Sequence, residues 1–407
     1  MSLTSVNGTR RTAASKGKRV CAIAYTEYIY DQRVKREAEA LVSRGDTVHF
    51  IGLEEGSGNP KESENGVSIT RMRLRKYQGR NPAKYILSYV CFFIVATAIM
   101  MKRHLKERYD VIYVHTMPDF LVFASLPAKL LGARVVLNVH DTMPELWQSK
   151  FAVSERHMLV RMLILQERVS CWFADRVVAV HKPHRRLLEK RGVPSSKLAT
   201  IMNLPDPKVF GPIRRRCADR IQDSDRPCLV YHGTVTKRLG LDIALRAFRG
   251  VMELCPSARF EIYGGGDAAP ALRELIRSLK LETNVYFPNS PFRGEDLPPI
   301  LCAATVGVIP NRSDAATQYM LPVKLLEYIH LGIPAVVPKL SAIQYYFDED
   351  AVAYFVPGNV SSLQSAICGL LSDRDKRERL IEKAQLFCRK YSWDCMKTQL
   401  FRVLDDI

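Results

Sequence analysis

The sequence predicts an α/β protein with two doubly wound parallel-sheet domains that face each other across a cleft. Short β-rich runs alternate with helix-like runs in both halves of the chain, and strand, helix, strand order at this spacing is typical of parallel sheets. The chain has 407 residues, which is more than one hydrophobic core usually serves, and 47% of them are hydrophobic. We therefore expect two cores, each with its own sheet.

The first domain is expected to span residues 18–208. Its alternating pattern has strand-like runs at 18–25, 47–53, 110–115, 134–139 and 175–180, with helix-like runs at 33–45, 123–133 and 184–192. Residues 1–17 carry basic side chains among Ser, Thr, Gly and Asn, and no apolar run follows them before the first strand. We expect this segment to be a disordered basic tail and not a signal sequence.

One segment of this domain, residues 85–101, contains no charged side chain. It is just short of the roughly 20 residues that span a bilayer. Basic residues flank it on both sides, namely Arg71, Arg73, Arg75, Lys76, Arg80, Lys84, Lys102, Arg103, Lys106 and Arg108. An apolar helix between basic clusters suits an anionic cytoplasmic membrane face, whereas a buried helix with solvated flanks is the alternative. We interpret residues 71–108 as a region that contacts an anionic membrane surface.

A polar, proline-containing stretch at 209–226 is expected to link the domains. The second domain, 227–385, repeats the pattern, with strand-like runs at 228–233, 259–264, 284–288, 306–310 and 335–338 and helix-like runs at 241–254, 271–280 and 323–332. Residues 386–407 are helical and are expected to pack back towards the first domain. Both domains are thus Rossmann-like, and open parallel sheets bind ligands beyond the carboxyl ends of their strands. We place the site between the domains.

The net charge and the spacing of the cysteines exclude several classes of function. Lys and Arg number 60 against 42 Asp and Glu, a net charge of +18 that favours anionic partners. No nucleic-acid recognition motif appears, which argues against a nucleic-acid partner. No G-x-G-x-x-G follows the first strand, which argues against a dinucleotide oxidoreductase. The ten cysteines form no C-x-x-C pair and have no clustered histidines, so we expect no metal site and reduced thiols in a cytosolic protein.

The most informative segment is 321–338. Pro322 suits the first turn of a helix and Gly332 suits its C-terminal cap. The free N-terminus of such a helix can hold a diphosphate with its backbone N–H groups, and Glu327 can accept two ribose hydroxyls. The alternative from physics alone is an amphipathic helix with one solvated Glu.

This segment resembles the signature of the retaining family 4 glycosyltransferases of the GT-B fold, glycosyl transferases group 1. In that signature a Glu, seven residues and a second Glu precede a run of a small residue, Gly, Pro, Val and Val. Glu327 matches the second Glu, and Tyr319 stands where the first would be. The resemblance implies that a nucleotide-sugar donor lies against Tyr319, Met320, Leu321 and Val323, and it extends from about residue 20 to the end.

The strand at 228–233 runs into a second matching loop. Gly233 and Thr234 begin it, and Lys237 and Arg238 supply cations. In similar enzymes an Arg and a Lys neutralise the charge that develops on the leaving nucleoside diphosphate. Arg238 is the closer match, Lys237 is its neighbour, and Thr234 stands where many members carry the Arg. A solvated loop is the alternative for the two cations.

A glycine-rich turn follows the strand at 259–263. It consists of Gly264, Gly265, Gly266 and Asp267, and glycine lets the backbone approach a ligand closely. The resemblance places this turn beside the base of the donor.

The first domain supplies the remaining candidates. Arg33 follows the first strand and is expected to meet the phosphates or the acceptor, although its neighbour Asp31 has the alternative role of an N-cap. His115 and His140 end two strands on the cleft side. The resemblance implies that His140 contacts the donor sugar and that Asp141 binds acceptor hydroxyls. His115 is assigned to the acceptor side, although a lone strand-end His is more often structural.

Together these matches predict a retaining glycosyltransferase that moves a sugar from a nucleotide diphosphate donor to an acceptor. The expected catalytic residues are His140, Lys237, Arg238 and Glu327, with neither a metal nor another cofactor. The expected acceptor is a lipid-linked or other glycan in surface polysaccharide synthesis, reached from the cytoplasmic face of the membrane. The alternative is a catalytically inert nucleotide-sugar-binding protein of the same fold, because Tyr319 replaces a carboxylate.

Overall fold

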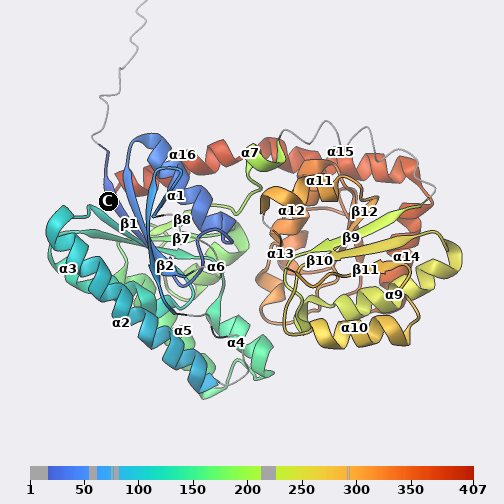
Figure 1. Cartoon of the computed structure of the whole chain (residues 1–407), viewed down its shortest axis with the longest axis horizontal. Helices are drawn as coiled ribbons and strands as arrows, with labels where there is room; N and C mark the ends of the chain where they lie inside the picture. The colour runs from blue at the N-terminus through green and yellow to red at the C-terminus, as the bar shows by residue number, and fades with distance from the viewer. Residues whose placement is uncertain are drawn as a thin grey trace, which may run out of the picture.

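A computed structural model describes residues 17–54, 62–74, 77, 82–211, 226–290, 292 and 294–407. It confirms two parallel-sheet α/β domains, which lie side by side (Figure 1). Three groups of sequence expectations fall outside the described residues: most of the N-terminal tail, most of the 209–226 linker, and the basic residues Arg75, Lys76 and Arg80.

The first sheet has eight strands in the order β3-β4-β2-β1-β5-β6-β7-β8. The strands are β1 (Arg19–Ala24), β2 (Thr47–Leu53), β3 (Ser63–Glu64), β4 (Val67–Met72), β5 (Val111–His115), β6 (Arg134–Val139), β7 (Arg176–Ala179) and β8 (Leu198–Thr200). All neighbours pair in parallel except β3 with β4, and the order reverses at β1, so β2 and β5 flank it. In such a sheet the carboxyl ends of the central strands border the ligand site.

Helices cover both faces of this sheet. They are α1 (Gln32–Arg44), α2 (Pro82–Glu107), η1 (Asp119–Ser125), α3 (Leu126–Leu130), α4 (Met143–Phe151), α5 (Met158–Phe173) and α6 (Lys182–Lys190). The short helix α7 (Pro207–Phe210) packs against the second domain instead. One core joins the sheet to α2, η1 and α5 through residues such as Ile23, Phe92 and Cys171. The other joins it to α1 through Val34 and Leu41. Burial on both faces explains why the strands read as continuous apolar runs.

The second sheet has six parallel strands in the order β11-β10-β9-β12-β13-β14. The strands are β9 (Cys228–His232), β10 (Arg259–Tyr263), β11 (Val285–Tyr286), β12 (Val306–Val308), β13 (Ala335–Pro338) and β14 (Ala353–Phe355). The helices are η2 (Lys237–Leu239), α9 (Leu241–Leu254), α10 (Ala269–Ser278), η3 (Gly294–Asp296), α11 (Leu297–Leu301), η4 (Thr317–Tyr319), α12 (Val323–Leu331), α13 (Ser341–Gln344) and α14 (Val360–Leu371). Two apolar clusters again lie on the two faces of the sheet.

The last two helices, α15 (Arg374–Lys390) and α16 (Trp393–Asp405), run along one edge of both domains (Figure 1). Helix α15 packs on α12 and α14, and α16 packs on α1 and β8. The Arg36 guanidinium lies 4.2 Å from the centroid of the Trp393 ring, and Met396 Sδ lies 3.2 Å from the Met202 amide. The end of the chain therefore belongs to the second domain through α15 and to the first through α16.

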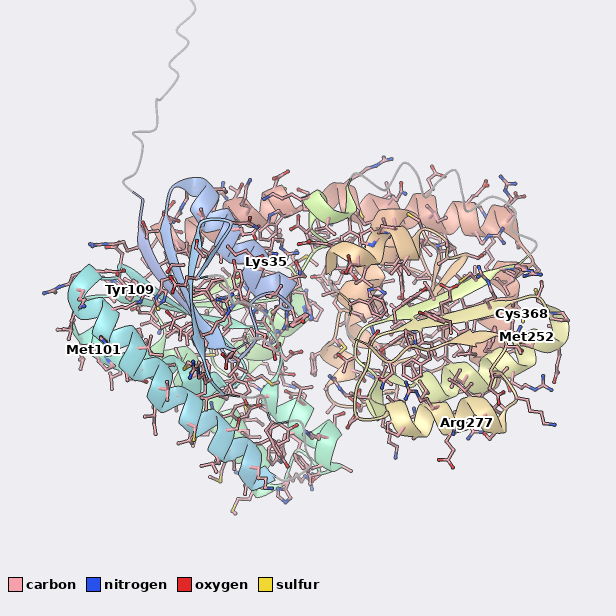
Figure 2. All side chains as sticks on the ribbon, viewed as in Figure 1. Lys35, Met101, Tyr109, Met252, Arg277 and Cys368 are labelled. Carbon is pink, nitrogen blue, oxygen red and sulfur yellow. The ribbon has the colours of Figure 1, made fainter. Side chains whose placement is uncertain are left out.

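Helix α2 is buried on one side only. Phe92, Ala96 and Met100 are fully buried in the first core, whereas Leu87 and Ile94 are about 60% exposed. By length and composition the stretch Ala83–Glu107 is able to cross a membrane, and 17% of its most apolar window is buried. Figure 2 shows Met101 and Tyr109 at the end of this helix that is farther from the second domain. One face of the helix is thus buried and the other is apolar and exposed, and contact with a membrane stays a prediction.

Eight of the described cysteines are free thiols, as expected, whereas Cys302 is disulfide-bonded. The free thiols include Cys21, Cys171 and Cys228, which are buried in the two cores. Burial raises the pKa of Cys228 to about 12 and that of Cys171 well above its ordinary value. These thiols are therefore protonated and serve as small apolar core residues.

Candidate active site

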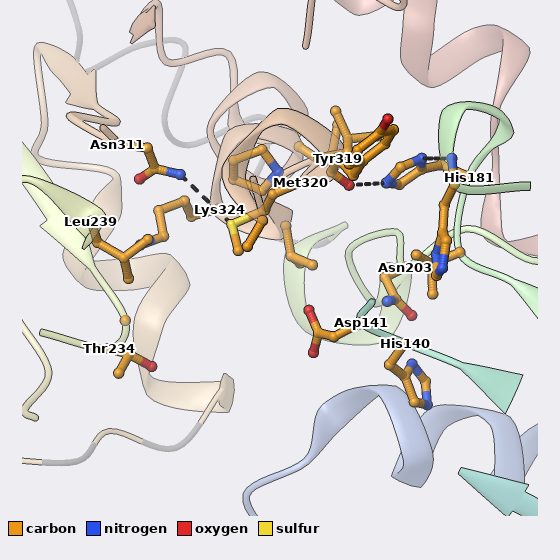
Figure 3. A pocket seen from close by; sticks show the side chains of 18 of the residues that line it. His140, Asp141, His181, Asn203, Thr234, Leu239, Asn311, Tyr319, Met320 and Lys324 are labelled. Atoms are coloured by element: carbon orange, nitrogen blue, oxygen red, sulfur yellow. Dashed lines mark hydrogen bonds between the residues drawn. The ribbon is translucent and has the colours of Figure 1, made fainter. Parts of the chain in front are cut away.

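A cavity of about 350 Å³ lies between the two domains (Figure 3). The first domain lines it with Arg33, His140, Asp141, Thr142, Leu146, Val180, His181, His184 and Asn203. The second domain lines it with His232, Gly233, Thr234, Arg238, Leu239, Asn311, Ala316, Tyr319, Met320, Leu321, Pro322, Val323, Lys324, Leu326 and Glu327. Several of these residues follow β6, β7 and β9 directly, so the cavity lies at the carboxyl ends of both sheets.

The N-terminus of α12 opens into this cavity. Pro322 is the N-cap residue, and the left-handed Gly332 (φ 76°) ends the helix, as their residue types predicted. In the part of the chain that the structure describes, the amides of Val323 and Lys324 have no hydrogen-bond acceptor, whereas the Leu325 amide bonds Pro322 O at 3.0 Å. Two unpaired N–H groups at the positive end of a helix dipole suit an anion.

Glu327 lies one turn further along α12. His232 Nε2 donates to Glu327 Oε2 at 2.6 Å, and the Tyr328 hydroxyl lies 3.1 Å from the other ring nitrogen of His232. Within the described ranges the second carboxylate oxygen, Oε1, has no hydrogen-bond partner. Glu327 is therefore held by one oxygen and can accept ligand hydroxyls with the other.

The cavity receives two cations from the second domain. Arg238 on η2 lines it, and the buried Nη1 of Arg238 has no partner among the described residues. Lys324 on α12 also lines it, and Nζ of Lys324 lies 3.8 Å from the centroid of the Tyr231 ring. Lys237, which the sequence paired with Arg238, is not one of the lining residues, and its carbonyl accepts from Arg312 at 3.2 Å. The second cation of this wall is thus Lys324, a residue that the sequence reasoning missed.

The glycine-rich turn after β10 lies behind the cavity. A Cβ atom on Gly264 would be 2.0 Å from Gly233 O, and one on Gly266 would be 2.2 Å from Val235 O. The two loops are joined by hydrogen bonds from Gly233 N to Tyr263 O (2.8 Å) and from Val235 N to Gly265 O (2.9 Å). None of Gly264, Gly265, Gly266 and Asp267 lines the cavity. Because glycine has no side chain, the two loops pack directly against each other, and this packing positions Gly233 and Thr234.

Arg33 reaches the cavity from the first domain. Asp31 occupies the N-cap position of α1, but its side chain makes no capping bond. Both oxygens of Asp31 instead accept from Arg33 at 3.0 Å, and Arg33 Nη1 lies 3.9 Å from Asp141 Oδ2. Although burial opposes the effect, the Arg33 guanidinium holds the pKa of Asp31 well below its usual range. Arg33 therefore enters the cavity already paired.

His115 and His140 form a buried pair at the ends of β5 and β6. His115 Nδ1 lies 2.9 Å from His140 Nε2, and the rings are stacked with 8° between their planes. Burial lowers the pKa of His115 to about 3 and the pKa of His140 well below its ordinary value, so both rings are neutral. His140 lines the cavity and its Nδ1 has no described partner, whereas His115 lies behind it. His115 orients His140 and does not itself reach the cavity.

A polar network lies beneath this pair. The Tyr113 hydroxyl donates to Glu37 Oε2 at 2.6 Å, and Asn138 Nδ2 donates to the same oxygen at 2.9 Å. Burial raises the pKa of Glu37 to about 7. The Tyr113 ring lies 4.5 Å from that of His115, so this network fixes the strand ends that carry the histidines.

Polar contacts between described residues join the two domains. His181 Nε2 lies 2.9 Å from the carbonyl oxygen of Tyr319 (Figure 3), and Ser149 Oγ donates to Asp314 Oδ2 at 2.6 Å. The Lys182 amide donates to the Tyr346 hydroxyl at 2.9 Å. Lys35, which Figure 2 shows near the second domain, lies 3.4 Å from Glu295 Oε1. The cavity is thus a joint site of both domains.

Among the described residues no group of three or more His, Cys, Asp or Glu side chains is arranged to hold a metal ion.

Several polar residues that line the cavity were not predicted from the sequence, namely His181, His184, His232 and Asn311. Their signal was weak because each is an isolated residue at a strand or loop end. Only the fold brings them to one cavity.

Two family models match the chain. A glycosyl transferase 4-like domain matches residues 30–203, and a glycosyl transferases group 1 domain matches residues 226–373. The sulfoquinovosyl transferase of Arabidopsis thaliana is 24% identical over 301 residues, 72% of this chain and 55% of that protein. The phosphatidyl-myo-inositol mannosyltransferase of Mycobacterium leprae is 27% identical over 177 residues, 42% of this chain and 44% of that one. The chain spans about half the length of these curated relatives.

Solved structures share the whole architecture. A sucrose-phosphate synthase from Thermosynechococcus elongatus superposes with a TM-score of 0.74 at 16% identity, covering 96% of this chain and 99% of that one. An Anabaena protein solved in complex with UDP and glucose superposes with a TM-score of 0.70 at 14% identity, covering 96% and 100%. At these identities the likeness establishes the fold.

Proposed function

Since the chain belongs to the group 1 glycosyltransferases of the GT-B fold, whose members use nucleotide-sugar donors, we propose that it is a retaining, metal-independent enzyme. The observation that carries this proposal is the N-terminus of α12, where two unpaired amides, Arg238 and Glu327 meet in one cavity between the domains. A helix N-terminus with a cation suits a diphosphate, and a carboxylate one turn on suits a ribose.

The donor binds mainly to the second domain. Its diphosphate lies between Arg238 and the amides of Val323 and Lys324, and its ribose hydroxyls bond Glu327 Oε1. Its base points towards the loop held by Gly264, and its sugar lies near Tyr319. That an Anabaena protein of the same fold was solved in complex with UDP and glucose supports a nucleotide-sugar donor for this cavity.

The acceptor approaches from the first domain, where His140, Asp141 and Arg33 line the cavity. The bond from the anomeric carbon to the phosphate oxygen breaks, and a bond to the acceptor oxygen forms on the same face. The acceptor proton passes to the departing phosphate, so no nucleophilic carboxylate is required. This route is supported by the two lining carboxylates, because Glu327 is held by His232 and Asp141 lies beside Arg33 on the other wall. Arg238 stabilises the charge on the leaving group in place of a metal.

Thermal unfolding with a panel of nucleoside diphosphates and nucleotide sugars tests the donor site. A ligand at a hundredfold its dissociation constant adds about 2.7 kcal/mol to the free energy of unfolding. We expect one base to give a selective rise in melting temperature, and turnover of the matching nucleotide sugar to be lost in Glu327→Ala. No shift with any nucleotide, or full turnover in that variant, would contradict the proposal.

We further propose that the enzyme is peripheral to the inner face of the cell membrane and that its acceptor is a lipid-linked intermediate of a surface glycan. Helix α2 presents Ile86, Leu87, Val90 and Ile94 to solvent, with Lys102 and Lys106 exposed beyond them. Its opposite face stays on the first core, so the helix lies along the bilayer instead of crossing it.

Helix α5 also presents exposed apolar residues with cations between them, and the sequence did not lead us to predict this surface. Its exposed apolar residues recur at helical spacing: Met158, Met162, Leu165, Val169 and Trp172. The exposed Arg161 and Arg168 lie between them. Both α2 and α5 pack on η1, so the two apolar stripes belong to one side of the first domain. An apolar stripe with interspersed cations suits anionic lipid headgroups.

Vesicle flotation tests the membrane proposal. We expect the protein to float with vesicles that contain phosphatidylglycerol and to float less with pure phosphatidylcholine. Glu substitutions at Leu87 and Ile94 are expected to abolish flotation, whereas Leu254→Glu, at a 72% exposed position of the second domain, is the matched control. Protein that stays away from all vesicles, or equal losses in the control, would overturn it.

The alternative function, an inert nucleotide-sugar-binding protein, is favoured by Tyr319 at the sugar end of the cavity. It predicts the same thermal shifts without turnover of the donor or of any acceptor tried.

A further inference from the structure

We propose that Lys324 is a direct ligand of the donor diphosphate and forms, with Arg238, a two-sided cationic clamp. This inference rests on the proposed function and deepens it by naming the second cation of the site. It concerns a residue of α12 and not the loop after β9, where the sequence placed both cations.

The surroundings of Lys324 hold its ammonium group in one place. Nζ lies 3.8 Å from the centroid of the Tyr231 ring, and the Tyr231 hydroxyl donates to Thr234 O at 2.6 Å, which fixes the ring. A Cβ atom on Gly233 would lie 3.2 Å from Nζ, so the ammonium occupies space that a larger residue would take. The cation–π contact and the absent side chain position the ammonium beside Gly233 and Thr234.

In the part of the chain that the structure describes, this ammonium group has no ion-pair partner. Among the described residues it makes no hydrogen bond or ion pair, since Glu327 Oε2 is taken by His232. Burial lowers the pKa of Lys324 to about 7, Glu327 opposes that shift, and Arg238 adds to it. A desolvated cation without a partner is unfavourable in the empty protein. An anion in the cavity would remove that penalty.

The donors around the cavity specify the kind of anion. Arg238 Nη1 is buried without a described partner, and the Val323 and Lys324 amides are unpaired. Arg238 and Lys324 come from different segments, η2 and α12, and both line the cavity. Several donors from two directions suit a ligand with many anionic oxygens, such as a diphosphate, better than a single carboxylate.

The test compares Lys324→Met, which keeps the length of the side chain, with Lys324→Arg, which keeps the charge. Binding is measured by calorimetry with UDP, GDP, inorganic pyrophosphate and the nucleosides uridine and guanosine. We expect Lys324→Met to weaken diphosphate binding about tenfold or more, which corresponds to about 1.4 kcal/mol or more. Nucleoside binding is expected to stay unchanged, because a nucleoside has no phosphate. Lys324→Arg is expected to retain most of the affinity. Lys339→Met, an exposed residue paired with Glu349 in the same domain, is the matched control.

A pH series separates a ligand role from a structural one. The charged or titratable groups around Lys324 are Tyr231 on β9, Arg238 on η2 and Glu327 on α12. Burial raises the pKa of Tyr231, so this group stays protonated. Binding of a nucleotide sugar, whose diphosphate has no proton to lose, requires Lys324 to be protonated. The wild-type affinity is therefore expected to fall as pH rises above about 7, with up to tenfold per pH unit, and this slope is expected to persist in Glu327→Gln and vanish in Lys324→Met.

The outcomes separate this inference from the proposed function. If the wild type binds no nucleotide, the proposed function fails. If the wild type binds a nucleoside diphosphate and Lys324→Met binds it equally well, only the clamp is wrong. A loss in Lys237→Met with full binding in Lys324→Met would return the second cation to the loop after β9. If Lys324→Met melts early, Lys324→Gln provides the same comparison, and full diphosphate affinity in that variant would overturn the clamp.

Discussion

The wall of the cavity that the first domain builds differs from the opposite wall in how its charges are balanced. In the first domain Arg33 is paired with Asp31, and His115 and His140 are held neutral by burial. In the second domain Arg238 Nη1 has no described partner, and Lys324 makes no described ion pair. A wall whose cation is already paired favours an uncharged hydroxyl-bearing ligand, whereas a wall with unpaired cations favours an anion.

A further buried cluster extends the contrast behind the first wall. Arg191 donates to both oxygens of Glu167, at 2.8 and 2.9 Å, and to Glu145. These residues follow α6 or lie on α5 and α4, so the cluster ties three helices together. Burial raises the pKa of Glu167 to about 7. Charged side chains behind the first wall are thus paired with one another, whereas Arg238 and Lys324 in the second wall stay available for a ligand.

The largest expected effect comes from removing a cation of the second wall. Arg238→Met is expected to lower kcat about 10²–10³-fold, since the group stabilises charge that develops on the leaving phosphate. Single-turnover kinetics with the nucleotide sugar measures the effect, and Arg249→Met on the exposed face of α9 is the control. A change below threefold would remove the contrast between the walls.

A buried carboxylate of the first domain gives the next largest effect. The pKa of the Glu37 carboxyl is raised to about 7 in the folded state, from an ordinary value of 4.5. The unfolded state therefore loses this proton first, and the free energy of unfolding falls as pH rises from about 4.5 through 7. The swing is about 3 kcal/mol for this one group. In Glu37→Gln we expect a smaller difference between the free energies of unfolding at pH 5 and pH 8, measured by urea titration. Identical pH dependence in the two proteins would show that Glu37 is not held protonated.

Glu327 tests the ribose contact on the second wall. Glu327→Gln is expected to weaken nucleoside diphosphate binding about 10- to 100-fold, because hydrogen bonds to charged groups contribute about 1.5–3 kcal/mol. The check is a cycle with a 2′,3′-dideoxy nucleoside diphosphate. The wild type should lose affinity for this ligand, and the variant should lose little more. Additive losses would place the ribose elsewhere.

The smallest effect is expected for the paired cation of the first wall. Arg33→Gln should change nucleoside diphosphate affinity by less than about threefold, because Asp31 already neutralises Arg33 and a partly exposed ion pair contributes little. Calorimetry beside Lys324→Met gives the comparison. A tenfold loss in Arg33→Gln would mean that the diphosphate bridges both walls.

The same contrast explains what the sequence could predict. Helix α12 was predicted within its limits because Pro322 and Gly332 mark its ends locally. The pairing of His115 with His140 joins residues 25 positions apart on neighbouring strands, which no local pattern encodes. Lys324 was readable as a cation in the first turn of that helix, but only the fold shows that Gly233 leaves room for it. The stripe on α5 was missed because its apolar residues also fit a core helix.

The α15–α16 segment has a mechanical consequence. The chain crosses between the domains twice, before α7 and between α15 and α16, and the two crossings lie close together, since Phe210, Tyr391 and Met396 belong to one apolar cluster. Two adjacent links form a hinge, about which one domain can rotate against the other. Helix α4 lies on the far side of the molecule from α16 (Figure 1), so the Ser149–Asp314 hydrogen bond acts with a long lever arm. A contact of given strength at that rim therefore opposes the opening of the cavity more than the same contact beside the hinge would.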